Sequence, residues 1–177
     1  MKKLMAMVFV LLLSLAGAGC TNTVDDTDSD VLKEPPALTV VCGDQSLEAN
    51  RGTTSWQYEN EDGTSEGFNS DSLHPLQAKE FMTPLELPTD DSVDQLEVSL
   101  QWDVDPEQVS VHCWSEASWD QIDAESEEIP VSTEDMNSSS ITLKGGNYIY
   151  EIVAEWNGNE KYSGTASYSF YTIKASE

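Results

Sequence analysis

Apolar side chains alternate with polar ones along much of the chain after Ala37, and this period of two constrains the fold more than any other feature. A strand turns successive side chains to opposite faces, so such alternation predicts a strand with one buried face. The longest run is 148–156, where Tyr, Ile, Ala and Trp side chains share one face and Glu151 and Glu155 lie on the other. Further strands are predicted at 38–42, 53–58, 84–87, 97–102, 109–113 and 164–173.

Turn-forming pairs separate these predicted strands. They are Asp62-Gly63, Gly145-Gly146 and Asn157-Gly158, and such pairs supply the backbone conformations of tight turns. The least strand-like pieces are 78–82, predicted as a short turn or helix, and 120–128, predicted as an acidic loop. Several short strands with this punctuation predict an all-β fold, an antiparallel sandwich of two sheets.

The segment Leu143-Lys-Gly-Gly146-Asn-Tyr148 stands just before the longest predicted strand. Its pattern Leu-x-x-Gly-x-Tyr resembles the tyrosine corner of immunoglobulin-like and fibronectin type III sandwiches, in which the Tyr hydroxyl returns to a backbone group upstream. The resemblance implies an Ig-like sandwich with Tyr148 as the corner residue and with 148–156 and 164–173 as the last two strands. A chance glycine turn before an aromatic strand is the alternative.

A charged start, a short apolar run and small residues open the chain, which is the pattern of a secretory signal peptide. Lys2 and Lys3 precede the apolar run 4–15, and small residues occupy 16–19. The run is shorter than the roughly 20 residues that span a bilayer. Residues 1–19 are therefore predicted to be removed on export.

Cys20 follows those small residues directly. The ending Ala18-Gly19-Cys20 resembles the lipobox of bacterial lipoproteins, with Gly17 where Leu is commonest. The resemblance implies cleavage before Cys20, attachment of diacylglyceryl to its sulfur, and a lipid anchor with acyl chains such as palmitate on the extracytoplasmic side of the cell membrane. An ordinary secreted protein with an incidental cysteine is the alternative.

Residues 20–36 are predicted to be a lipid-anchored acidic linker. The stretch 21–36 reads TNTVDDTDSDVLKEPP, which is too poor in apolar side chains to offset the chain entropy lost on folding. It is expected to be disordered and to hold the folded body, 37–177, away from the membrane.

Two cysteines remain in the predicted body, Cys42 and Cys113, and each alternates in phase with apolar neighbours. An even count in an exported protein favours a disulfide between them, and two buried reduced thiols are the alternative. Such a pair would differ from the immunoglobulin framework disulfide, because Cys42 lies on the first predicted strand and that framework uses the second.

The chain carries 33 acidic and 8 basic side chains, a formal net charge of −25. This charge excludes most nucleic-acid binding, because a phosphate backbone needs a basic face to displace its counterions. It also opposes docking on anionic lipid or teichoic acid. Any protein or polysaccharide partner is therefore expected to be neutral or basic.

Sequence motifs of catalysis are missing. The chain has no HExxH zinc motif, no Gly-x-Ser-x-Gly elbow and no Gly-rich phosphate loop. His74 precedes a proline in a predicted loop, and His112 is out of phase with the apolar face of its strand. The acidic stretch 59–63 lacks the spaced ligands of a calcium loop. No catalytic residue, metal or cofactor is predicted, and the protein is not predicted to be an enzyme.

Trp114 and Trp119 are the candidate ligand-binding residues, because both fall in or beside an acidic, Ser-rich segment predicted as a loop. Aromatic rings at the edge of a sandwich can stack on sugar rings or anchor a protein partner. The alternative is structural, with Trp114 packed in the core and Trp119 pinning the loop.

Five short patches resemble a small β domain of Gram-positive lipoproteins and extracytoplasmic sensor regions. The patches are Gly52-Thr53-Thr54-Ser55-Trp56, His74-Pro75-Leu76, Val111-His112-Cys113-Trp114, Tyr148-Ile149-Tyr150-Glu151 and Gly164-Thr165-Ala166-Ser167-Tyr168. The resemblance implies an envelope location and an accessory role, and it brings no activity or catalytic residue with it.

Taken with the charge and the N-terminal pattern, these features predict a membrane-anchored, cell-surface lipoprotein that acts as a non-enzymatic binding or interaction module. Two alternatives stay open, a carbohydrate-binding domain that uses exposed tryptophans and an accessory or sensor domain of an envelope protein complex.

Overall fold

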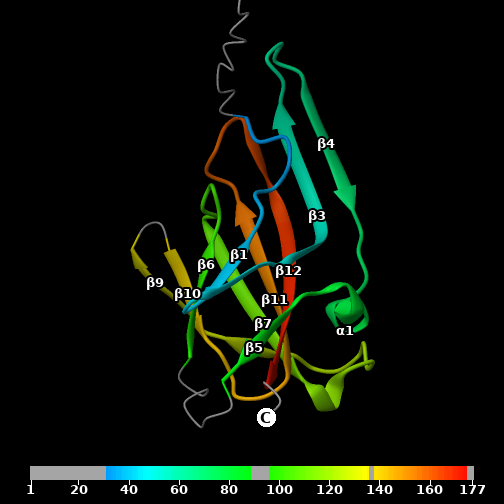
Figure 1. The fold of residues 1–177 in the computed structure, drawn as a ribbon. Coiled ribbons are helices and arrows are strands. Elements are labelled where there is room, and N and C mark those ends of the chain that lie inside the picture. Colours follow the sequence, from blue (N-terminus) through cyan, green and yellow to red (C-terminus); the bar gives the residue numbers. More distant parts are fainter. Residues whose placement is uncertain (1–30, 89–95, 136–137, 175–177) are drawn as a thin grey trace, which may run out of the picture.

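A computed structural model describes residues 31–88, 96–135 and 138–174, and these residues form two β-sheets packed face to face (Figure 1). The segment 1–30, which includes the predicted signal and Cys20, lies outside the described residues. The strands are β1 (Thr39–Cys42), β2 (Gln45–Glu48), β3 (Asn50–Glu59), β4 (Ser65–Ser70), β5 (Pro84–Leu87), β6 (Glu97–Gln101), β7 (Gln108–Ser115), β8 (Glu127–Ile129), β9 (Val131–Asp135), β10 (Ser138–Thr142), β11 (Tyr148–Trp156) and β12 (Tyr162–Lys174). The short helices are α1 (Pro75–Ala78), η1 (Lys79–Phe81) and η3 (Glu116–Ser118).

The first sheet has the strand order β2-β1-β6-β10-β9, and the second has the order β4-β3-β12-β11-β7-β8. Every pairing is antiparallel except that of β5, which lies parallel to the end of β12. The predicted all-β antiparallel sandwich is therefore confirmed.

The order of the central strands is that of an Ig-like sandwich. Strands β1-β6-β10-β9 stand in the A-B-E-D arrangement, and β7-β11-β12 stand in the C-F-G arrangement of the opposite sheet. The segment from β2 to β5 is inserted between β1 and β6, the first two of these strands. Its hairpin β3–β4 extends the second sheet beyond β12, as Figure 1 shows.

Aromatic side chains fill the core between the sheets. Trp156, Tyr150, Tyr168 and Phe170 are among the largest fully buried side chains. The Tyr150 and Phe170 rings stack at 4.9 Å between centroids, and Trp56 meets Trp156 edge-on at 5.5 Å. Such ring pairs add about 0.5–1.5 kcal/mol each to the free energy gained by burial.

Tyr150 makes the tyrosine corner. The prediction of Tyr148 is therefore wrong by two residues, which is one period of the strand. The backbone N–H of Lys144 donates to the Tyr150 hydroxyl at 2.8 Å. Tyr150 is fully buried and points from β11 into the core, which lets its hydroxyl reach back to the turn before the strand. Tyr148 opens the strand half-buried, and the Lys144 ammonium lies 5.9 Å from its ring centroid.

Replacing Tyr150 by Phe should lower the free energy of unfolding by about 1–2 kcal/mol, because the part-buried Lys144 N–H loses its acceptor. Tyr148→Phe is the matched control and should change it far less. Urea unfolding of both variants measures the difference. Equal values for the two variants would contradict the assignment of the corner to Tyr150.

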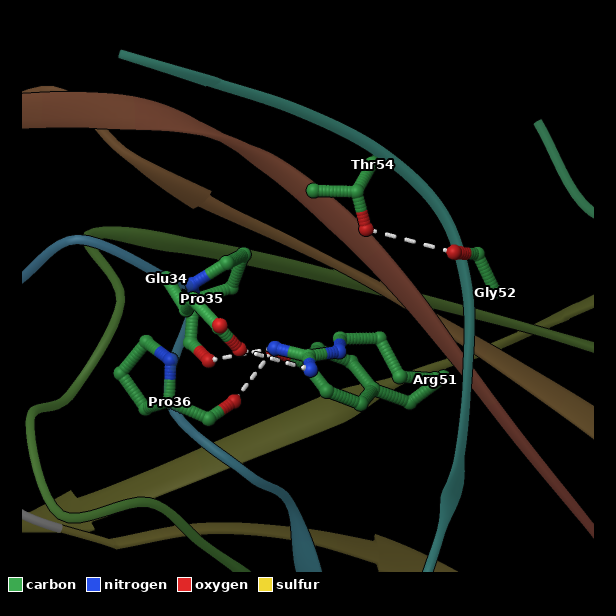
Figure 2. A network of polar contacts seen from close by, with 7 residues as sticks. Glu34, Pro35, Pro36, Arg51, Gly52 and Thr54 are labelled. Carbon is green, nitrogen blue, oxygen red and sulfur yellow. Dashed lines mark hydrogen bonds and ion pairs between the residues drawn. The ribbon is translucent and has the colours of Figure 1, made fainter. Parts of the chain in front are cut away.

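The last part of the predicted linker is folded, because 31–36 lies against the body with Pro35 and Pro36 buried. Three of its backbone carbonyls accept hydrogen bonds from side chains of the sandwich. They are Leu32 from Trp56 (2.8 Å), Pro35 from Arg51 (3.0 Å) and Pro36 from Tyr168. Figure 2 shows the Arg51 guanidinium at Pro35 and at the Glu34 carboxylate, 3.1 Å away. The folded body thus includes 31–36, and the predicted boundary at residue 37 is too late.

The predicted disulfide is absent, because Cys42 and Cys113 are both buried and free. Cys42 is on β1, which follows directly after Pro36 and its bond to Tyr168 of β12. Cys113 is on β7, two strands away from β12. The two thiols therefore belong to strands of different sheets, and they are not bonded to each other. Burial raises the pKa of the Cys113 thiol to about 11, so this thiol stays protonated at neutral pH.

Candidate functional site

A groove of about 300 Å³ runs along the outer face of the second sheet beside α1. We call it the α1 groove. It is lined by Asn50, Gly52, Ser72, Leu73, Pro75, Ala78, Phe81, Ser167 and Ser169.

The wall of the α1 groove is a single helical turn held down by its apolar side. Pro75 starts α1, where its missing N–H is no loss, and His74 caps the turn by accepting from the Leu76 N–H at 3.3 Å. Leu76 is 1% exposed and packs with Trp114 and Ile149 in a small second core. The turn is therefore fixed on the sheet, and its residues Pro75 and Ala78 line the groove.

The floor of the α1 groove is a β-bulge. The register of β3 and β12 shifts so that Gly52 and Thr53 together oppose Ser167, and bulges of this kind often re-aim side chains near functional sites. A Cβ at Gly52 would lie 2.4 Å from the Ser167 hydroxyl oxygen, so a side chain there would require that hydroxyl to move. The Thr53 and Ser72 hydroxyl oxygens lie 3.2 Å apart. The floor thus presents hydroxyl groups in a fixed arrangement.

Two exposed apolar side chains stand at the rim. Phe81 is 70% exposed and Leu73 is 53% exposed, and both line the α1 groove. Large apolar side chains with this exposure on one groove are a common feature of interaction surfaces. The arrangement offers an apolar contact above a hydrogen-bonding floor.

A half-buried carboxylate lies beside this floor. Glu151 on β11 pairs across the strands with His112 on β7 and with Ser169 on β12. Burial raises the pKa of the Glu151 carboxyl, and His74, His112 and a hydrogen bond from Ser167 oppose the rise. Both histidines of the chain thus act on one carboxylate. Within the described parts of the chain, no group of three or more His, Cys, Asp and Glu side chains could hold a metal ion.

Trp114 and Trp119 do not form an exposed pair. Trp114 is 6% exposed, and its indole N–H donates to the Ala124 carbonyl at 3.1 Å. Trp119 packs edge-on against Tyr171, and the Lys79 ammonium lies 3.6 Å from its ring centroid. Trp114 thus holds the loop at Ala124, and Trp119 packs between η1 and β12.

The rim and the floor of the α1 groove leave little signal in the amino-acid sequence. Phe81 falls in 78–82, the piece noted as least strand-like, and an aromatic residue there was the available hint. Ser and Thr recur at every second position over 163–169, a pattern typical of a polar strand face, but no pattern in the sequence marks the bulge opposite Ser167.

Comparisons of the chain with protein-family models, with curated proteins and with solved structures give no match. No helix among the described residues is long and apolar enough to cross a membrane.

Proposed function

We propose that the protein is a lipid-anchored binding module of the cell surface, held at Cys20 and contacting a basic protein partner through the α1 groove. It acts by binding and not by catalysis. If the partner is another envelope protein, the proposed role is that of an accessory or sensor domain.

The observation that carries the proposal is the pair Phe81 and Leu73 at the rim, 70% and 53% exposed. Exposing them to water is unfavourable, and covering a large apolar side chain contributes about 1.5–3 kcal/mol. The turn below them is anchored by Leu76 and does not need them for packing. A partner side chain seated between them would also reach the hydroxyls of the floor.

Charge supports a basic partner. Asp71 and Glu80 adjoin the rim residues in the sequence and are exposed, and neither forms an ion pair in the described parts of the chain. The formal net charge of −25 adds a long-range attraction for cationic surfaces. The partner segment is therefore expected to carry an apolar side chain flanked by Lys or Arg.

The position of the N-terminal segment supports the anchored arrangement. In Figure 1 the described chain enters at the top of the sandwich, whereas α1 lies toward the opposite end. A tether that joins Cys20 to Val31 would therefore leave the α1 groove on the side away from the membrane.

Photocrosslinking on whole cells tests the proposal. A p-benzoylphenylalanine at position 81 is expected to give one major adduct, whose crosslinked peptide is rich in Lys or Arg. The same residue at position 46, exposed on β2 of the other sheet, is the control and should give none. An adduct pattern shared by both positions, an acidic peptide or no adduct at position 81 would overturn the proposal.

A further inference from the structure

A second groove, of about 410 Å³, lies on the outer face of β4, β3 and β12. We call it the amide groove. It is lined by Ser55, Trp56, Gln57, Gly67, Phe68, Asn69, Asn157, Ser163, Gly164 and Thr165.

No lining side chain of the amide groove is charged, although the chain carries 33 acidic side chains. The lining instead combines the carboxamides of Gln57, Asn69 and Asn157 with three hydroxyl groups. Carboxamides and hydroxyls both donate and accept hydrogen bonds. This combination matches a neutral ligand that also presents hydroxyls as donors and acceptors.

The strand register arranges these groups in two rows across the sheet. In one row, Asn69, Ser55 and Thr165 stand opposite one another on three neighbouring strands. In the next, Gln57 stands between Gly67 and Ser163, and its amide donates to the Ser163 hydroxyl at 2.7 Å. Neighbouring strands are about 4.8 Å apart, so the first row offers evenly spaced polar groups to an extended ligand.

Two glycines that line the amide groove let its strands pack closely. A Cβ at Gly164 would lie 2.1 Å from the Ser55 carbonyl oxygen, and one at Gly67 would lie 2.7 Å from the Trp56 carbonyl oxygen. Gly164 also has a φ of +153°, which side chains rarely adopt. Gly67, opposite Gln57, thus leaves the backbone open on the face of the amide groove, whereas Gly164 makes room for the buried Trp56 ring, which would lie 2.8 Å from its Cβ.

The polar groups of the first row are available to a ligand. Within the described chain, the side chains of Asn69, Ser55 and Thr165 have no hydrogen-bond partner. The carboxylates nearest to Asn157 belong to Glu107 and Glu155, and both accept hydrogen bonds from Asn157.

We infer that the amide groove is a binding site for a neutral oligosaccharide that lies across β4, β3 and β12. The inference rests on the uncharged lining, the two polar rows and the open backbone at Gly67, and it is independent of the anchor at Cys20 and of the α1 groove. It places carbohydrate recognition on a surface that contains neither Trp114 nor Trp119.

Calorimetry of the purified full chain with oligosaccharides tests the site. The panel contains neutral hexaoses of glucose, mannose, xylose and N-acetylglucosamine, together with acidic oligogalacturonate. At least one neutral hexaose is expected to bind, and oligogalacturonate is expected not to bind. Asn69→Ala and Gln57→Ala should each weaken binding about five- to tenfold, the effect of losing one or two hydrogen bonds.

Two control variants separate this site from the rest of the surface. Ser46→Ala on β2 and Phe81→Ser in the α1 groove should bind the hexaose as tightly as the unchanged chain. Thermal melts establish that Gln57→Ala and Asn69→Ala remain folded. Failure of every neutral hexaose to bind, equal binding of oligogalacturonate, or undiminished affinity in folded Asn69→Ala would overturn the inference.

Discussion

A chain truncated to begin at Ala37 should be about 3–5 kcal/mol less stable than one truncated to begin at Val31. The deletion removes the carbonyl acceptors of Trp56, Arg51 and Tyr168. Each lost hydrogen bond costs about 1–1.5 kcal/mol, and the buried surfaces of Pro35 and Pro36 are lost as well. Denaturant unfolding of the two truncated proteins, measured under the same conditions, gives the difference.

A control variant separates these buried contacts from the ion pair beside them. Glu34→Gln removes the ion pair with Arg51. The Glu34 side chain is 70% exposed and the Arg51 side chain is 42% exposed, so the free energy of unfolding should fall by less than about 1 kcal/mol. Equal stability of the two truncated chains would contradict the finding that 31–36 belongs to the folded body.

The error at 31–36 shows what composition alone misses. The stretch is polar and ends in Pro35-Pro36, so the balance of apolar surface against chain entropy predicts disorder. Its contacts are made mainly by backbone carbonyls, which every residue has, with side chains such as Trp56 that are distant in the sequence. Such acceptors leave no pattern in the sequence.

The strands with strong apolar alternation were the predictable ones. The predicted boundaries 84–87 and 148–156 match β5 and β11, because each has one face in the core. Strands β4 and β10 read Ser-Glu-Gly-Phe-Asn-Ser and Ser-Ser-Ser-Ile-Thr and were not predicted. All six residues of β4 are exposed, so only the pairing with β3 makes it a strand.

The candidate site was less predictable than the fold. Trp114 and Trp119 drew attention because they stand in a segment predicted as a loop. In the structure they are packing residues, because α1 of the inserted segment lies against them and Leu76 packs with Trp114. The amide groove depends on how β4, β3 and β12 are paired. That pairing cannot be predicted from the sequence, in which β4 has no strand pattern.

Replacing Cys20 by Ala should move nearly all of the protein from the membrane to the soluble fraction. One acyl chain binds a membrane reversibly, whereas two or more anchor a protein stably, since each buried methylene contributes about 0.8 kcal/mol. The body offers no replacement for such an anchor, because its net negative charge opposes binding to anionic lipid. The effect is therefore expected to be close to complete.

Metabolic labelling with a palmitate analogue, followed by fractionation of the cells, tests the central claim of lipid anchoring most directly. We expect the unchanged chain to be labelled and to sediment with membranes, and Cys20→Ala to be unlabelled and to appear in the medium or periplasm. An unlabelled wild-type chain, or a Cys20→Ala variant that still sediments with membranes, would contradict it.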